Sequence, residues 1–212
     1  MSKKIMFNDK FDLTQAVLEG RKTMTRRIIK YPRTFRGEWV AGFNIHRSPS
    51  DKKIVGFPCM YDADEREFDM GEILPKYKLG EVVAIAQSYE SIYNEKGLET
   101  MDMLVSGLKN HKGWQNKLFV AAGEMIHHIR ITDIKVERLQ DISDEDCFKE
   151  GIYASNSHEI GYGIPWVYEF AKSKMAYYTP REAFAALIDK VSGKGTWESN
   201  PFVFAYEFVL VD

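Results

Sequence analysis

The sequence predicts an α+β fold built around a small, partly closed β-barrel with flanking helices. Three observations support this prediction: short strand-like segments recur along the chain, a few helices lie between them, and the last segment is again a strand. The chain has 212 residues, 44% hydrophobic and 28% charged, so we expect an ordinary packed core. We expect one domain, residues 1–212, with insertions at about 32–78 and 90–116.

The first segment reads as a short strand followed by a helix. Residues 5–7, Ile-Met-Phe, form the strand, and Asp12 is the expected helix N-cap, with Gln15 completing a capping box. Helical spacing places three apolar side chains on one face: Leu13, Ala16 and Val17. Gly20 stands where a helix ends in a left-handed residue, and a strand is expected at 26–29.

The middle of the chain alternates strands with polar connections. Proline and glycine break residues 32–80 into short β-segments, at 39–45 and 54–60. Residues 82–86 form a continuously apolar strand that we expect to be buried on both faces. Weak helical character marks residues 98–108, and the alternation of apolar and polar residues at 126–136 predicts a long strand.

The last third carries the strongest helix signals. Ser143 caps a helix that ends at Gly151. Thr179, followed by a proline and by a glutamate three residues on, begins another helix that ends at Gly193. The strand at 202–210 places four aromatic side chains on one face: Phe202, Phe204, Tyr206 and Phe208.

Composition limits the classes of function. A net charge of −2 is not that of a basic protein that coats nucleic acid. No apolar run approaches the ~20 residues of a membrane span, and the start lacks a signal-peptide pattern, so we expect a cytoplasmic protein without membrane partners. The two cysteines lack metal-ligand spacing, and the adjacent His127 and His128 point to opposite faces of a strand, so neither a metal nor another cofactor is expected.

The sharpest charge feature is the stretch from Gly20 to Arg27, Gly-Arg-Lys-Thr-Met-Thr-Arg-Arg. Strand alternation puts Thr25 and Arg27 on one face and Arg26 on the other, and Lys22 lies in the preceding turn. Lys22, Thr25 and Arg27 can therefore converge on one small anionic or nucleotide-like ligand. The competing interpretation is a solvated basic edge that discourages strand pairing.

This stretch resembles the GxKxxxxR signature of ASCH domains, which have a PUA-like β-barrel fold. Two further segments are similar to the larger, prophage-associated branch of that family: residues 136–142, followed by Glu-Gly-Ile at 150–152, and residues 195–204. Residues 32–78 and 90–116 are not covered by the resemblance. The resemblance implies an RNA- or nucleotide-binding protein, with Gly20, Arg21, Arg26 and Arg27 among the ligand-binding residues.

The resemblance also implies a possible enzyme. One small bacterial branch, with the motif GRKTxTxR, hydrolyses N4-acetylcytidine through a lysine, a threonine and a glutamate. These correspond to Lys22, Thr25 and, as the best match, Glu150. The chain departs from the larger branch at 80–89, where charged and tryptophan positions are replaced, and we expect Tyr89 to substitute in ligand binding.

Three functions follow as hypotheses. The first is binding of RNA or of a nucleoside or nucleotide without catalysis. The second is an amidohydrolase acting on N4-acylated cytidine, with Lys22, Thr25 and Glu150 as catalytic residues. The third is a ribonuclease, although no metal-binding carboxylate set supports it. Trp197 could stack on a base, but a core role is the favoured interpretation, as it is for Cys147.

Overall fold

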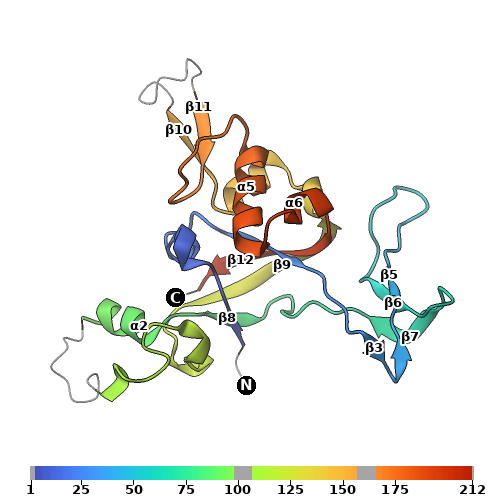
Figure 1. The fold of residues 1–212 in the computed structure, drawn as a ribbon, viewed down its shortest axis with the longest axis horizontal. Coiled ribbons are helices and arrows are strands. Elements are labelled where there is room, and N and C mark those ends of the chain that lie inside the picture. The colour runs from blue at the N-terminus through green and yellow to red at the C-terminus, as the bar shows by residue number, and fades with distance from the viewer. Residues whose placement is uncertain (1–2, 98–106, 157–165, 212) are drawn as a thin grey trace.

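The computed structural model describes residues 3–97, 107–156 and 166–211. The fold is mixed α+β, as expected, and centres on a five-stranded sheet in the order β1-β8-β9-β12-β2 (Figure 1). Only β1 and β8 are parallel to each other; the other neighbours are antiparallel. In sheet order the strands are β1 (Lys4–Ile5), β8 (Val82–Ile85), β9 (His128–Arg138), β12 (Phe202–Leu210) and β2 (Met24–Ile28).

The sheet does not close into a continuous barrel, because among the described strands no backbone ladder joins β1 to β2. The two end strands are linked by a side chain instead. The guanidinium of Arg27, on β2, donates a hydrogen bond to the carbonyl of Met6, directly after β1. The gap between the two ends of the sheet therefore has a polar bridge across it.

Helices pack on this sheet and on one another. The 13-residue α5 (Pro180–Ser192) begins with the predicted capping box of Thr179 and Glu182. Ser143 caps α4 (Asp144–Lys149) as predicted, its side chain accepting from the Asp146 amide. The short α6 (Thr196–Ser199), which the sequence pattern did not indicate, packs against α5 through Trp197 and Phe184, whose ring centroids are 6.0 Å apart. The core role predicted for Trp197 is consistent with this contact.

The first helix, α1 (Leu13–Leu18), buries Leu13, Ala16 and Val17 as predicted. Its predicted cap is wrong. Asp12 has a left-handed backbone and makes no side-chain cap hydrogen bond, because its carboxylate pairs with Lys172 at 2.7 Å. A short 3-10 helix, η1 (Asp9–Phe11), occupies the residues just before it and is capped by Asn8.

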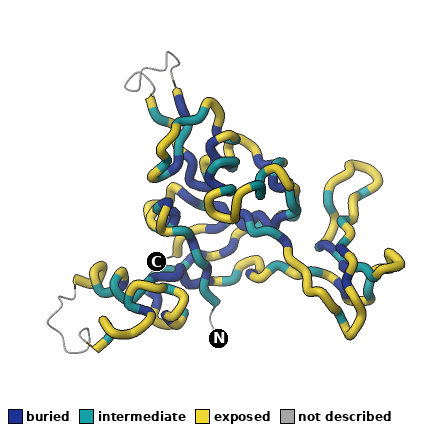
Figure 2. The backbone as a smooth tube through the Cα atoms, viewed as in Figure 1, coloured by how far each residue is buried: buried dark blue, intermediate teal, exposed yellow. Residues whose placement is uncertain are grey.

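The main core lies where the sheet meets α1, α4 and α5 (Figure 2). Cys147 is fully buried in it, and three of the four predicted aromatic residues of β12 are buried there: Phe204, Tyr206 and Phe208. The strand predicted at 82–86 is buried from Val83 to Ala86, whereas Val82 is exposed. A smaller apolar cluster joins β8 to the segment that follows it: Ala84, Ala86, Ile92, Val120 and Met125.

The remaining elements lie outside the main sheet. Residues 32–78 form two small sheets that extend away from it (Figure 1). The strand expected at 39–45 is interrupted at Val40 and Ala41. These sheets contain β3 (Thr34–Phe35), β4 (Glu38–Trp39), β5 (Gly42–Asn44), β6 (Cys59–Tyr61) and β7 (Glu67–Glu72). A further hairpin, absent from the sequence-based expectation, pairs β10 (Tyr153–Asn156) with β11 (Trp166–Glu169).

The second expected insertion, at about 90–116, contains most of α2 (Tyr89–Glu95). Two three-residue 3-10 helices follow it, η2 (Lys117–Phe119) and η3 (Ala122–Glu124). Another 3-10 helix, η4 (Leu139–Asp141), follows β9. Most of the helical stretch expected at 98–108 lies outside the described residues. Within the described ranges, no helix has the length and apolarity needed to cross a membrane.

Candidate functional site

The turn after α1 directs Lys22 into the molecule. Gly20 has the predicted left-handed backbone, with φ of +72°. The amide of Lys22 then returns to the helix and donates to the carbonyl of Ala16 at 2.9 Å. As a result, a residue that opens a strongly basic stretch has only 2% of its surface exposed.

Inside, Lys22 meets the end of α4. Its ammonium donates to the Glu150 carboxylate at 2.6 Å and to the Glu150 backbone carbonyl at 2.8 Å. A backbone hydrogen bond of 2.9 Å from Thr23 to Lys149 ties the same two segments together. Lys22 and Glu150, two of the three residues expected to be catalytic, are thus in direct contact.

Gly151 makes this approach possible. Its φ of +103° is unfavourable for a residue with a Cβ, and an added Cβ would lie 3.4 Å from the Leu13 side chain and 3.9 Å from Lys22. The glycine therefore allows α4 to end tightly against α1 and the Lys22 turn. The sequence signal was correct here, because Gly151 was expected to end the helix.

The charge of Lys22 is set by opposing influences. Burial lowers the pKa of Lys22, Glu150 raises it through its charge and its hydrogen bond, and the nearby Arg27 and Arg26 lower it again. The net direction is downward from the ordinary lysine value of 10.5. Lys22 has three N–H donors, and the two Glu150 contacts use two of them, which leaves one for a further acceptor.

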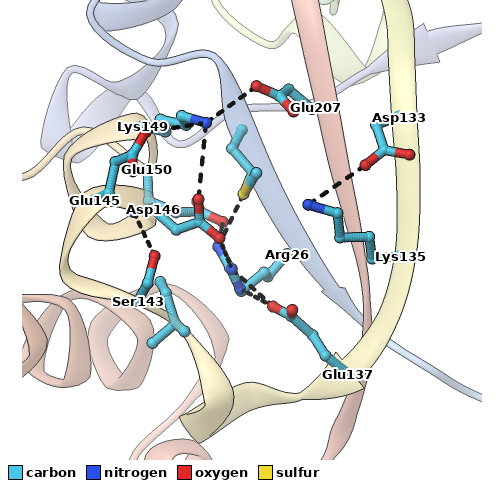
Figure 3. Close-up of polar contacts among 12 residues, drawn as sticks. Arg26, Asp133, Lys135, Glu137, Ser143, Glu145, Asp146, Lys149, Glu150 and Glu207 are labelled. Atoms are coloured by element: carbon cyan, nitrogen blue, oxygen red, sulfur yellow. Dashed lines mark hydrogen bonds and ion pairs between the residues drawn. The ribbon is translucent and has the colours of Figure 1, made fainter. Parts of the chain in front are cut away.

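Arg26 lies on the opposite face of β2 from Thr25 and Arg27, as strand alternation predicts. Its guanidinium contacts three carboxylates, and the residues that carry them are all labelled in Figure 3. The distances are 2.7 Å to Glu137, 2.8 Å to Asp146 and 3.2 Å to Glu150. Burial acts to lower the pKa of Arg26, but Glu150 and Glu137 outweigh it and raise that pKa. Arg26 therefore fixes the position of Glu150 while its own donors are occupied.

Arg27 is much less engaged. Its guanidinium donates to the Met6 carbonyl and lies 5.9 Å from the centroid of the Phe7 ring. Its Nε is enclosed and has no hydrogen-bond partner in the part of the chain that the structure describes. An enclosed N–H without an acceptor is uncommon in native proteins and points to a missing partner.

Lys22, Thr25, Arg27 and Glu150 all line one pocket of about 390 Å³, between β2 and the segment after β1. Its opposite wall is the second half of α5, with Leu187, Ile188, Val191 and Ser192. Thr25 is itself buried, with 5% of its surface exposed. The predicted convergence of the lysine, the threonine and the arginine on one concave site is what the structure contains.

Other predicted site residues are placed differently. Gly20 and Arg21 are exposed and do not line the pocket, and Arg21 pairs with Glu19 at 2.5 Å. Tyr89 begins α2, where its ring packs 5.5 Å from the ring of His111, and it does not line the pocket either. Arg26 borders the pocket, but its side chain is held by the carboxylates described above.

Several pocket residues were not predicted as site residues. They come from two places: the segment after β1, with Met6, Phe7 and Asn8, and the end of α5. One signal was available on α5. The helical spacing of Leu187, Ile188 and Val191 indicates an apolar face, and Val191, at the end of that face, is 37% exposed and lines the pocket. Lys30, exposed at the rim, follows the basic stretch in sequence and was not predicted as a site residue.

The pocket contains no cluster of metal ligands. Within the described ranges, no group of three or more His, Cys, Asp or Glu side chains is arranged to hold a metal ion. His127 instead contacts Glu95 through Nε2. Comparison of the chain with protein-family models, with curated proteins and with solved structures gave no match.

Proposed function

We propose that the pocket between β2 and α5 binds a nucleotide, as a free molecule or as an exposed residue of RNA. The observation that carries the proposal is the convergence of Lys22, Thr25, Arg27 and Glu150 on one pocket with an apolar opposite wall. Its volume of about 390 Å³ falls within the usual range for small-molecule sites. The PUA-like relationship suggested by the basic motif is part of the same proposal.

The two walls suit the two kinds of surface that a nucleotide presents. Leu187, Ile188 and Val191 can pack against the face of a base or sugar. The free N–H of Lys22, the hydroxyl of Thr25 and the carboxylate of Glu150 offer donors and acceptors to polar edges. Lys30, exposed at the rim, supplies a cation for a phosphate.

Calorimetric titration of the full chain with the four ribonucleoside 5′-monophosphates tests this proposal. We expect saturable binding of at least one of them, weakened by rising salt because phosphate contacts release counterions. The variant Ser192→Trp places a large side chain at the mouth of the pocket and should abolish binding.

Lys194→Trp is the matched control, because Lys194 is exposed two residues further on and does not line the pocket. It should bind as the wild type does. Binding that survives Ser192→Trp, or its absence from the wild type for all four nucleotides, would overturn the proposal.

A second candidate function is hydrolysis of N4-acylated cytidine. The observation that favours it is that Lys22, whose pKa is lowered mainly by burial, shares the pocket with Thr25 and Glu150. In this reaction Lys22, as the neutral amine, takes the proton of the Thr25 hydroxyl while the Thr25 oxygen attacks the acyl carbon. The bond to N4 then breaks, and Lys22 returns the same proton to N4 of the leaving cytidine. Water then releases the acyl group from Thr25 as the free acid.

The assay is incubation of purified protein with N4-acetylcytidine, with cytidine and acetate measured by chromatography. Thr25→Val keeps the shape but removes the hydroxyl and should abolish turnover, whereas Thr25→Ser should retain part of it. Equal turnover by wild type and Thr25→Val, or no turnover by protein that binds cytidine nucleotides, would leave binding alone as the function.

A further inference from the structure

The nucleotide pocket has a neighbour on the other side of Arg27. A second pocket of about 300 Å³ lies between the end of β2 and the segment that leads into β8. The two pockets share four lining residues: Met6, Arg27, Ile28 and Lys30. They are therefore two compartments of one groove, divided by the hydrogen bond from Arg27 to Met6.

The second compartment has an apolar lining with a basic rim. Tyr77, Phe204 and Tyr206 line its inner end as buried side chains, with 4%, 6% and 1% of their surface exposed, and Leu74 lines the opening with 64% of its surface exposed. Both tyrosine hydroxyls are already used: Tyr77 donates to the Lys4 carbonyl, and Tyr206 accepts from the Lys76 amide, each at 3.0 Å. The surface left for a ligand is thus mainly apolar and tolerant of base identity.

Cations mark the boundary between the compartments. Lys30 is exposed and lines both of them, while Lys76 is exposed and lines only the second. Arg27 stands in the dividing wall, and its enclosed Nε lacks a partner among the described residues. A phosphate that bridges two compartments would meet Lys30 directly and Arg27 after a small shift of its side chain.

We propose that the groove binds two consecutive nucleotides of single-stranded RNA, one base in each compartment, with the phosphate between them at Lys30 and Arg27. This inference rests on the proposed nucleotide binding and specifies its ligand class. A duplex does not suit the arrangement, because each compartment is a separate concavity that accepts an unpaired base.

The test compares two ligands of the full chain that differ by the second nucleoside. The first is a nucleoside 3′,5′-bisphosphate, pNp, and the second is the dinucleotide pNpN, each made with all four bases. Both carry two phosphates, and the terminal 3′-phosphate of pNp has the higher negative charge, which favours pNp at a basic site. Tighter binding of the dinucleotide therefore reports the second base and sugar. We expect the dinucleotide to bind about tenfold more tightly or better, because its second base occupies the second compartment.

Leu74→Glu places a carboxylate at the mouth of the second compartment, where it needs no core rearrangement. It should remove the advantage of the dinucleotide over pNp, whereas pNp, whose base does not enter this compartment, should still bind saturably. Leu79→Glu is the matched control, because Leu79 is 68% exposed and lines neither compartment.

The outcomes separate the two proposals. Equal affinity for both ligands, or a dinucleotide advantage that survives Leu74→Glu, overturns the two-nucleotide groove and leaves single-nucleotide binding intact. Failure of the wild type to bind either ligand overturns both proposals together.

Discussion

Arg26 and Arg27 are adjacent in sequence and carry the same charge, yet their guanidinium groups have very different partners in the fold. Arg26 faces α4 and meets three carboxylates within 3.2 Å. Arg27 faces the gap between the ends of the sheet, where it has one carbonyl acceptor and an enclosed Nε without a partner in the described structure. A strand that looks uniformly basic therefore has a compensated face and an uncompensated one.

The difference shows that neighbouring residues of one charged motif can have separate roles, one structural and one available to a ligand. Fully paired buried charges hold geometry, since moving any one of them leaves others without partners. Arg26 in this sense holds Glu150, which in turn holds Lys22. An incompletely paired cation retains capacity for a ligand. Basic density alone does not distinguish the two roles, whereas the register of β2 against β12 does.

The largest expected effect comes from removing Arg26. Arg26→Met leaves Glu137, Asp146 and Glu150 clustered without their common partner. We expect the free energy of unfolding to fall by about 3–5 kcal/mol, as for other broken buried ion pairs. Urea denaturation followed by circular dichroism measures this change. A loss below about 1 kcal/mol would contradict the structural role assigned to Arg26.

The second prediction concerns how the free energy of unfolding changes with pH. Because burial lowers the folded-state pKa of Lys22 from 10.5, the unfolded chain holds this proton to higher pH than the folded chain does. In the window between the lowered pKa and 10.5, the unfolded state binds more protons, so the contribution of Lys22 to stability rises with pH.

Urea denaturation at a series of pH values up to 10.5 tests this expectation in wild type and Lys22→Met. The unfolding free energy of the wild type minus that of the variant should increase with pH in this window. Subtraction removes the tyrosine titrations common to both proteins. A difference that is flat or decreasing would show that Glu150 outweighs burial and keeps the lysine charged.

The smallest effect on stability is expected at Arg27. Arg27→Met loses the hydrogen bond to Met6, which contributes about 0.5–1.5 kcal/mol, but also removes an enclosed N–H that costs about 1–3 kcal/mol when unsatisfied. The two terms nearly offset each other, so unfolding free energy should change by no more than about 1 kcal/mol. Nucleotide affinity, measured on the same folded variant, should fall nonetheless. If Arg27→Met is strongly destabilised, Arg27 has a structural role like that of Arg26, and the proposed difference between the two arginines is wrong.

Local signals in the sequence predicted much of the scaffold. Ser143 and Thr179 cap helices as expected, Gly20 and Gly151 end them, and the long alternating stretch became β9. Each of these features is decided by residues a few positions apart, which is why a pattern along the chain identifies them. Alternation within β2 likewise separated Thr25 and Arg27 from Arg26 correctly.

Features decided by distant partners were missed. Asp12 looked like a cap, but Lys172 draws its carboxylate away across 160 positions of sequence. The apolar wall of the pocket comes from α5, and nothing near Lys22 in the sequence indicates it. Tyr89 was expected at the ligand as a substitute for the charged and tryptophan positions replaced at 80–89, yet α2 carries it toward His111 instead. Tertiary packing, not local preference, sets these placements.

The pairing of β2 has a consequence for the order in which the molecule assembles. Among the described strands β2 pairs only with β12, and Lys22 meets Glu150 across 128 positions of sequence. Contacts between residues so far apart in sequence form more slowly than local ones. During synthesis from the N-terminus, β2 is made early. It cannot pair with β12 until residues 202–210 have been made. The groove is therefore among the last parts to form, and its basic strand depends on the other end of the chain for its shape.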